Sequence, residues 1–241
     1  MPSVYYPGLE RLQADSLVRL EGEEFHHLAR VAKRRLKDIL LLNSGKGTLA
    51  TAKVEKLEAH SVLLRLTEIK FPEERRHPFA IAFALLRNRN DELLVEKCTE
   101  LGVSALFPLI TEHSIHQAMD NTITRFGRIS LAAAKQCDNP WLPEIRHPQK
   151  LETALETIRE AGYTPILCSE RKPDRWLYHL TEEEVGRPCF LIGPEGGWSE
   201  AEFKLMEGLT EITLGDLITR AETAGIVVAA QWQAFANNLD Q

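Results

Sequence analysis

Long apolar runs, paired cysteines and phosphate-binding motifs are all missing from this sequence of 241 residues. No stretch of about 18 uncharged apolar residues occurs, so a membrane-spanning helix is excluded. The beginning of the chain has no basic flank followed by an apolar segment, and we expect no secretory signal there. The four cysteines, Cys98, Cys137, Cys168 and Cys189, lie far apart with no CxxC pair. That spacing argues against a zinc site or a disulfide scaffold, and scattered thiols fit a reducing cytoplasm.

What the sequence does contain is enough apolar material for a folded core, with an uneven distribution of charge. Hydrophobic residues make up 44% and charged residues 27%, which is ordinary for a globular protein. The net charge of −6 hides a difference between two parts of the chain. Residues 1–72 carry 12 basic and 9 acidic side chains, whereas residues 73–241 carry 17 and 26. The basic surplus of the first part keeps nucleic-acid binding open for it.

The spacing of apolar residues changes near residue 72, which predicts two domains, 1–72 and 73–241. The segment 70–78 is charged and bracketed by prolines, as expected of a linker. Several closely spaced short strands before it suggest a small β-barrel. The predicted strands are 17–20, 39–42, 48–57 and 61–69, and helical spacing predicts a helix at 23–33.

After the linker, apolar strands alternate with amphipathic helices. The predicted strands are 79–86, 105–110, 164–168, 188–192 and 211–214. The predicted helices are 91–101, 122–137, 151–161, 199–208 and 221–237. This alternation is typical of an α/β domain with a mainly parallel sheet covered by helices on both faces.

A glycine-rich turn between a predicted strand and a predicted helix is the first segment that could carry chemistry. It reads Gly-Pro-Glu-Gly-Gly over 193–197. Ser199, followed three residues later by Glu202, matches a capping box, which places a helix start directly after the turn. Open α/β sheets bind ligands at such strand ends, although a tight turn that needs glycine only for its geometry is the alternative. The segment lacks the GxxxxGK[ST] pattern, and Glu195 would repel a polyphosphate, so we expect a cationic ligand or one held by neutral backbone contacts.

Two further segments carry clustered charges. Arg220, Glu222 and Thr223 gather where the last predicted helix begins, in an otherwise alanine-rich stretch. Glu222 complements the helix dipole there, and from this segment alone an ordinary helix start with an Arg–Glu pair is the simpler interpretation. Lys97 and Glu100 lie three residues apart on a predicted helix, which by itself indicates a solvated surface pair.

Taken together, these segments resemble the RsmE family of ribosomal RNA methyltransferases, which are SPOUT-class enzymes. The resemblance covers essentially the whole chain. It rests on LIGPEGGWSEAE at 191–202, LGDLITRAETAG at 214–225, EKCTELGV at 96–103, HHLARVAKRRLKDILLLNSGKG at 26–47 and AAAKQCDNPWLPEI at 132–145. It implies a PUA-like β-barrel for the first domain. For the second it implies a SPOUT parallel sheet with a deep trefoil knot within about residues 163–241.

The resemblance also implies an activity. It is the S-adenosylmethionine-dependent N3-methylation of a specific uridine in 16S, small-subunit, ribosomal RNA. The family further implies a cytoplasmic homodimer that acts on this RNA or on the assembled small subunit, with neither a metal nor a membrane. Two alternatives stay open: a SPOUT methyltransferase with a different RNA target, and a catalytically inactive RNA-binding or assembly factor.

On this resemblance, residues take three roles. Arg220 would stabilise the anion that uracil becomes on losing its N3 proton, and Glu222 would act as the base. The expected cofactor-binding residues are Leu167, Cys168, Ser169, Ile192, Gly193, Glu195, Gly196, Leu214, Gly215, Leu217 and Thr219. The expected RNA-binding residues are His27, Arg30, Lys33, Arg34, Arg35, Lys97 and Lys135, because cations neutralise the phosphate backbone.

The sequence departs from the family pattern at several positions. Asp216 and Leu217 stand where the family commonly has Pro-Arg, and Thr219 replaces a leucine. In the segment that resembles the family's AxEQxGR, Lys135 holds the acidic position and Asn139 that of the arginine. Because such positions are expected to touch RNA, these departures bear on the target nucleotide more than on cofactor binding.

Overall fold

The computed structural model of the chain describes residues 3–26, 28, 36–114, 121–171 and 174–239. The chain divides into two compact units. One comprises Met1–Glu74 together with Leu131–Leu142, and the other comprises Arg75–Ser130 together with Pro143–Gln241. Helix α3 (Thr122–Gln136) therefore begins in the second unit and ends in the first. Among the residues described, no helix is long and apolar enough to cross a membrane.

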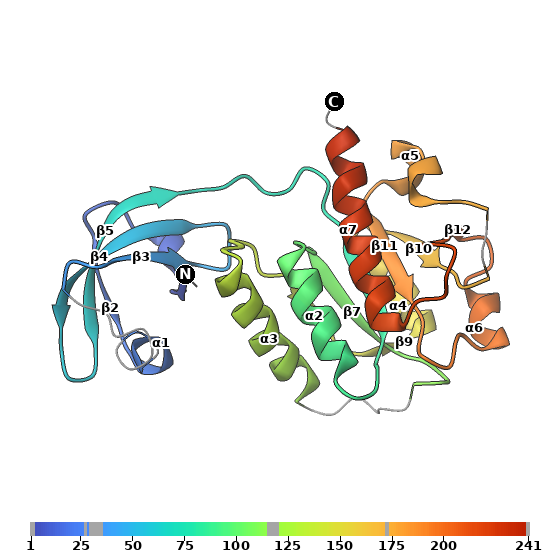
Figure 1. Cartoon of the computed structure of the whole chain (residues 1–241), viewed down its shortest axis with the longest axis horizontal. Coiled ribbons are helices and arrows are strands. Elements are labelled where there is room, and N and C mark those ends of the chain that lie inside the picture. The colour runs from blue at the N-terminus through green and yellow to red at the C-terminus, as the bar shows by residue number, and fades with distance from the viewer. Residues whose placement is uncertain (1–2, 27, 29–35, 115–120, 172–173, 240–241) are drawn as a thin grey trace. The chain divides into compact units, whose positions relative to one another are not determined.

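The first unit is built around a five-stranded sheet with the order β1-β3-β4-β5-β2. Its neighbouring strands are antiparallel except for β1, which runs parallel to β3. Two register shifts between β4 and β5, at Thr51/Ala52 and Val54/Lys56, bend these strands, and the sheet curls into a half-barrel (Figure 1). The elements are β1 (Val4–Tyr5), the 3₁₀ helix η1 (Leu9–Arg11), β2 (Leu17–Leu20), α1 (Gly22–His26), β3 (Ile39–Asn43), β4 (Leu49–Leu57) and β5 (Val62–Lys70).

One face of this curled sheet forms the core of the first unit. Alternate residues of each strand point to the same face, so Leu40 and Leu42 of β3 are buried together with Leu64 and Leu66 of β5. Phe25 of α1 packs into the same cluster. The alternating sequence pattern thus correctly predicted a small β-domain. Its sheet forms a half-barrel and not a closed barrel.

The segment that follows α3 packs against the turn between β3 and β4. The backbone N–H of Gly47 donates to the carbonyl oxygen of Pro140 at 2.8 Å, and Asn43 Nδ2 donates to that of Asn139 at 2.8 Å. A Cβ at Gly47 would lie 2.2 Å from the Trp141 ring, and the φ of +84° favours glycine as well. Asn139 therefore has a structural partner in the first unit.

The second unit contains a parallel sheet with the order β12-β10-β11-β6-β7-β8, in which β9 also pairs with β7. The strands are β6 (Ala80–Ala84), β7 (Ala105–Ile110), β8 (Glu144–Ile145), β9 (Gln149–Lys150), β10 (Thr164–Cys168), β11 (Pro188–Ile192) and β12 (Thr210–Ile212). The helices besides α3 are α2 (Asn90–Glu100), α4 (Leu151–Glu160), η3 (Leu177–His179), α5 (Glu182–Val185), α6 (Glu200–Leu205) and α7 (Ala221–Leu239). The prediction of an α/β domain with a parallel sheet is confirmed.

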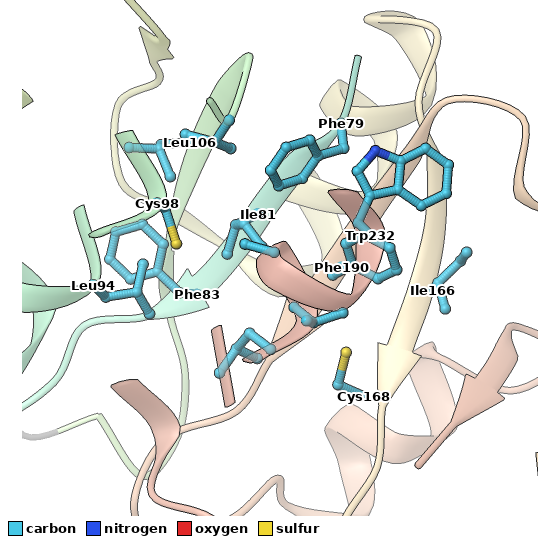
Figure 2. Close-up of a cluster of buried hydrophobic side chains, with 14 of the residues drawn as sticks. Phe79, Ile81, Phe83, Leu94, Cys98, Leu106, Ile166, Cys168, Phe190 and Trp232 are labelled. Atoms are coloured by element: carbon cyan, nitrogen blue, oxygen red, sulfur yellow. The ribbon is translucent and has the colours of Figure 1, made fainter. Parts of the chain in front are cut away.

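Two hydrophobic clusters lie on opposite faces of this sheet. On the face covered by α2 and α7, the Trp232 ring lies 6.4 Å from that of Phe79 and 5.9 Å from that of Phe190 (Figure 2). Trp232 Nε1 also donates to the carbonyl oxygen of His77 at 3.1 Å, which anchors α7. Helices α4 and α6 contribute to the cluster on the other face. Burial on both faces explains why the central strands are apolar throughout.

The observed elements differ from the predicted ones mainly at their ends. Strand β12 stops at Ile212, two residues earlier than expected, because the chain turns there into a loop. Of the predicted helix 23–33, only the part up to His26 and Leu28 belongs to the described residues. Segments of two to four residues, such as β1, β8, β9 and α5, are too short to carry a periodic pattern. The trefoil knot and the domain boundary at residue 72 stay predictions.

Candidate functional site

The loops that follow β10, β11 and β12 converge at the carboxyl ends of these strands. Together with the first turn of α7 they enclose a cavity of about 460 Å³, which we call the glycine-loop cavity. Its lining consists of Cys168, Ser169, Glu170, Ile192, Gly193, Pro194, Glu195, Gly196, Gly197, Thr213, Leu214, Gly215, Leu217, Ile218, Thr219, Arg220, Ala221 and Ala224. Open α/β sheets bind ligands at this edge, and the volume is that of a small-molecule site.

The structure brings the residues predicted to bind the cofactor to this one cavity, with a single exception. Leu167 is fully buried in the core of the second unit and does not line the cavity. The lining residues that the expected list lacks are Glu170, Pro194, Gly197, Thr213, Ile218, Ala221 and Ala224. The available signal was their position, since all of them lie in or beside a predicted strand end or one of the motif segments.

Two positions in the loop after β11 require glycine, because neighbouring side chains lie too close for a Cβ atom. A Cβ on Gly193 would lie 2.8 Å from Trp198 Nε1, and a Cβ on Gly196 would lie 2.9 Å from the Cβ of His113. Side chains at these positions would therefore displace their neighbours. Without them, the backbone groups of the loop are open to close contact with a ligand.

The predicted capping box at the start of α6 is present. Ser199 Oγ accepts a hydrogen bond from the backbone N–H of Glu202 at 3.3 Å, and Glu202 Oε2 accepts one from that of Ser199 at 2.9 Å. Glu202 Oε1 also accepts from the backbone N–H of Glu112 at 2.9 Å. This buried carboxylate therefore ties the end of the glycine loop to the segment after β7.

The loop after β12 carries exposed side chains beside the cavity. Gln231 Nε2 of α7 donates to the carbonyl oxygen of Leu214 at 3.2 Å, which holds the beginning of the loop. Leu217 and Ile218 are 83% and 74% exposed. Arg220 is exposed directly before α7. The loop thus presents two large apolar side chains and one cation next to the cavity.

The charges of the lining favour a cationic or neutral ligand over a phosphate. Glu170 and Glu195 supply carboxylates, whereas Arg220 is the single cation among the described lining residues. Glu195 Oε1 is held by the backbone N–H of Arg87 at 2.9 Å. Burial raises the pKa of the Cys168 thiol, so this group stays protonated and weakly polar. Nowhere in the described part of the chain do three or more His, Cys, Asp or Glu side chains gather to hold a metal.

Glu222, predicted as the base, lies inside the fold. The residue is only 6% exposed and does not line the cavity. Its Oε2 atom is buried, and no described residue offers it a hydrogen bond. Its proposed role as a base therefore has no support from the geometry. Helical spacing located the start of α7 but could not tell which way the first-turn side chains face.

The residues predicted to contact RNA fall into two groups. His27, Arg30, Lys33, Arg34 and Arg35 lie outside the described residues. Lys97 Nζ lies 2.7 Å from Glu96 and 2.8 Å from Glu100, and hydrogen bonds to Glu100 and then Glu96 raise the pKa of its ammonium group. Lys135 is paired with Glu24. Both amines have carboxylate partners, so contact with a phosphate requires these pairs to open.

The chain is similar to known proteins over most of its length. Residues 73–233 match a family model described as an RNA methyltransferase domain, and residues 20–67 match one described as an RNA methyltransferase PUA domain. The ribosomal RNA small subunit methyltransferase E of Synechocystis sp. is 30% identical over 225 residues, which cover 92% of this chain and 74% of the relative.

Solved structures resemble both units together. The ribosomal RNA small subunit methyltransferase E of Neisseria gonorrhoeae, bound to S-adenosyl methionine, matches with a TM-score of 0.84 and 27% identity over 97% of each chain. A structure from Legionella pneumophila, described as a methyltransferase in complex with the cofactor SAM, matches with a TM-score of 0.82 and 27% identity over 96% of each chain.

Proposed function

Because this chain belongs to the RNA methyltransferase family of ribosomal RNA small subunit methyltransferase E, we propose that it methylates N3 of one uridine in small-subunit ribosomal RNA, with S-adenosylmethionine as the methyl donor. One observation carries the proposal. The two loops that hold the family motifs, residues 193–197 and 214–220, form a single cavity at the carboxyl edge of the parallel sheet. The match of residues 20–67 to an RNA methyltransferase PUA domain supports an RNA substrate.

The residues of the glycine-loop cavity fit S-adenosylmethionine. The loop at 193–197 offers backbone N–H and C=O groups to an adenine, and Ile192 and Leu214 offer apolar contact. Glu170 and Glu195 suit the positive charges of the donor. When bound, the donor supplies an electrophilic methyl group. We assign its binding to Cys168, Ser169, Ile192, Gly193, Glu195, Gly196, Leu214, Gly215, Leu217 and Thr219, with Leu167 supporting them from the core.

Arg220 is the group that we assign to the acceptor. The N3–H of uracil is a weak acid, and its loss places negative charge on the ring oxygens. A guanidinium donates hydrogen bonds in a fixed planar geometry, which suits such an anion. Arg220 lines the cavity and is exposed, so an incoming base can reach it.

We further propose that the protein acts as a homodimer in the cytoplasm, on naked ribosomal RNA or on the assembled small subunit. The exposed Leu217 and Ile218 support a dimer, because burying large apolar side chains of one loop against a second protein surface is favourable. Cytoplasmic action follows from a ribosomal RNA substrate.

Methylation of small subunits tests the proposal directly. The purified protein is incubated with labelled S-adenosylmethionine and small subunits that lack the modification, with naked ribosomal RNA in parallel. The RNA is then digested and the methylated nucleoside identified. We expect 3-methyluridine at one site. Donor binding without transfer would indicate a different RNA target, and absence of donor binding would indicate an RNA-binding or assembly factor.

Arg220→Ala tests the role of the arginine. We expect single-turnover methyl transfer to fall on the order of 100-fold or more, because a charge-stabilising donor is lost, while the affinity for S-adenosylmethionine is unchanged. Arg159→Ala is the matched control, since Arg159 is exposed on α4 and does not line the cavity. A near-normal single-turnover rate in Arg220→Ala would contradict the assignment.

A further inference from the structure

A second cavity adjoins the glycine-loop cavity. It has a volume of about 360 Å³ and is lined by Arg87, Glu112, His113, Ser114, Glu195 and Gly196. Glu195 and Gly196 line both cavities, so the two share a wall. Transfer between two bound molecules needs the reacting atoms about 3–3.5 Å apart. A cavity that shares a wall with the donor site is therefore a place where an acceptor can meet the donor.

His113 is fixed against this shared wall. Its Nδ1 lies 2.8 Å from the carbonyl oxygen of Gly197. A carbonyl oxygen only accepts hydrogen bonds, so Nδ1 carries the proton and the Nε2 of the neutral ring keeps a lone pair. The backbone on both sides is held as well, since Glu112 N–H donates to Glu202 and Ser114 N–H donates to the carbonyl oxygen of Thr111. Gly196 also lies close to the Cβ of His113. The glycine loop thus sets both the position and the tautomer of this imidazole.

The charged groups that line the second cavity, besides His113, are the guanidinium of Arg87 and the carboxylates of Glu112 and Glu195. Arg87 is exposed, and its backbone N–H donates to Glu195. No described residue forms an ion pair with the Arg87 guanidinium, so this group can contact one phosphate of the RNA, while the two carboxylates favour a neutral base over a second phosphate. The second cavity therefore combines the Arg87 cation with the imidazole of His113, beside the proposed donor site.

We propose that the second cavity receives the target uridine, with its uracil ring at the wall shared with the glycine-loop cavity that Arg220 lines, and that His113 Nε2 is the base of the methyl transfer; this rests on the function proposed above. Nε2 takes the proton from N3 of uracil. The N3 electron pair forms a bond to the methyl carbon as the carbon–sulfur bond breaks, and the electrons of that bond stay on sulfur. The products are 3-methyluridine, S-adenosylhomocysteine and an imidazolium, which returns its proton to water. Glu222 is buried and lines neither cavity, so the imidazole takes the role expected of it.

His113→Gln removes the base but keeps an N–H donor for the Gly197 carbonyl. We expect single-turnover methyl transfer to fall by about 10²–10⁴-fold, with unchanged affinities for S-adenosylmethionine and RNA. His147→Gln is the matched control, because His147 is exposed between β8 and β9 and lines neither cavity. A normal rate in His113→Gln, or a loss of transfer confined to Glu222→Gln, would overturn the proposal.

A change in the acidity of the substrate separates a base from a structural support. RNA with 5-fluorouridine at the target position has a more acidic N3–H and depends less on a base. We therefore expect this RNA to reduce the defect of His113→Gln relative to that measured with uridine. Equal defects on both RNAs would show that the imidazole only supports the fold.

Binding provides a readout that does not depend on turnover. Protein labelled with ¹³C-histidine is saturated with S-adenosylhomocysteine, and a synthetic RNA of the target region is added. The ring signal missing from His113→Gln should shift, whereas that of His147 should stay. No shift at His113 would overturn the proposal. Failure of the wild-type protein to methylate any uridine would instead overturn the function on which it rests.

Discussion

Single side chains differ sharply in reactivity according to their burial, and the cysteines show it best. Cys98, Cys168 and Cys189 are buried, whereas Cys137 is exposed. Burial raises the pKa of the Cys98 thiol to about 12, and it also raises the pKa values of the Cys168 and Cys189 thiols. A thiol reagent at neutral pH is therefore expected to react quickly with one cysteine in the folded protein and with all four in guanidinium. Fast reaction of two or more thiols in the folded protein would contradict these positions.

The carboxylate of Glu58 on the surface is expected to make stability depend on pH. Hydrogen bonds from Lys56, then Ser61 and Arg19, lower the pKa of Glu58 from 4.5 to about 2. The folded state therefore favours the charged form, and its contribution to stability is present above pH 4.5 and lost as the pH falls toward 2. Glu58→Gln is expected to lower the free energy of unfolding slightly at neutral pH. Denaturant unfolding should show that this difference from wild type disappears near pH 2. A difference independent of pH would show that it does not come from the charge of Glu58.

Among the elements, the glycine loop and α6 depend on one another through the capping box. Ser199→Ala removes the acceptor for the Glu202 N–H and is expected to lower the free energy of unfolding by about 0.5–2 kcal/mol. Ser199→Thr keeps a hydroxyl and serves as the control in the same denaturant experiment. If threonine and alanine reduced stability equally, the loss would come from packing and not from the cap.

In the whole molecule, the division of charge predicts where RNA binds. The acidic surplus of residues 73–241 opposes RNA, so the cations of the first part are expected to supply most of the phosphate contacts. Combined Arg34→Glu and Arg35→Glu substitutions are expected to weaken binding of small-subunit ribosomal RNA. They should also reduce the slope of log affinity against log salt by about 0.7–0.9 per lost phosphate contact.

Filter binding at several salt concentrations checks this prediction. The control pairs Arg159→Glu with Lys204→Glu, two exposed cations of α4 and α6 in the second unit. Equal weakening by both pairs would show that only net charge matters.

Much of the second unit follows from local sequence patterns. Its buried strands have apolar sequences and its helices have amphipathic ones. The spacing of Ser199 and Glu202 by itself indicates a helix start. The order of the strands and the sharing of residues 131–142 with the first unit do not follow in this way. They depend on pairing between segments far apart in the chain, about which local periodicity carries no information.

Local patterns identify the loops of the candidate site, because each loop follows a predicted strand and two of them lead into a predicted helix. Which side chains of these loops face the cavity depends on the packing of the folded chain. Glu222 and Leu167 are buried and do not line the cavity. His113, in the loop after β7, lies close to Gly196 of the glycine loop. The physical reason is that the direction of a side chain is set by what packs around it, and those neighbours come from strands that are adjacent only after folding.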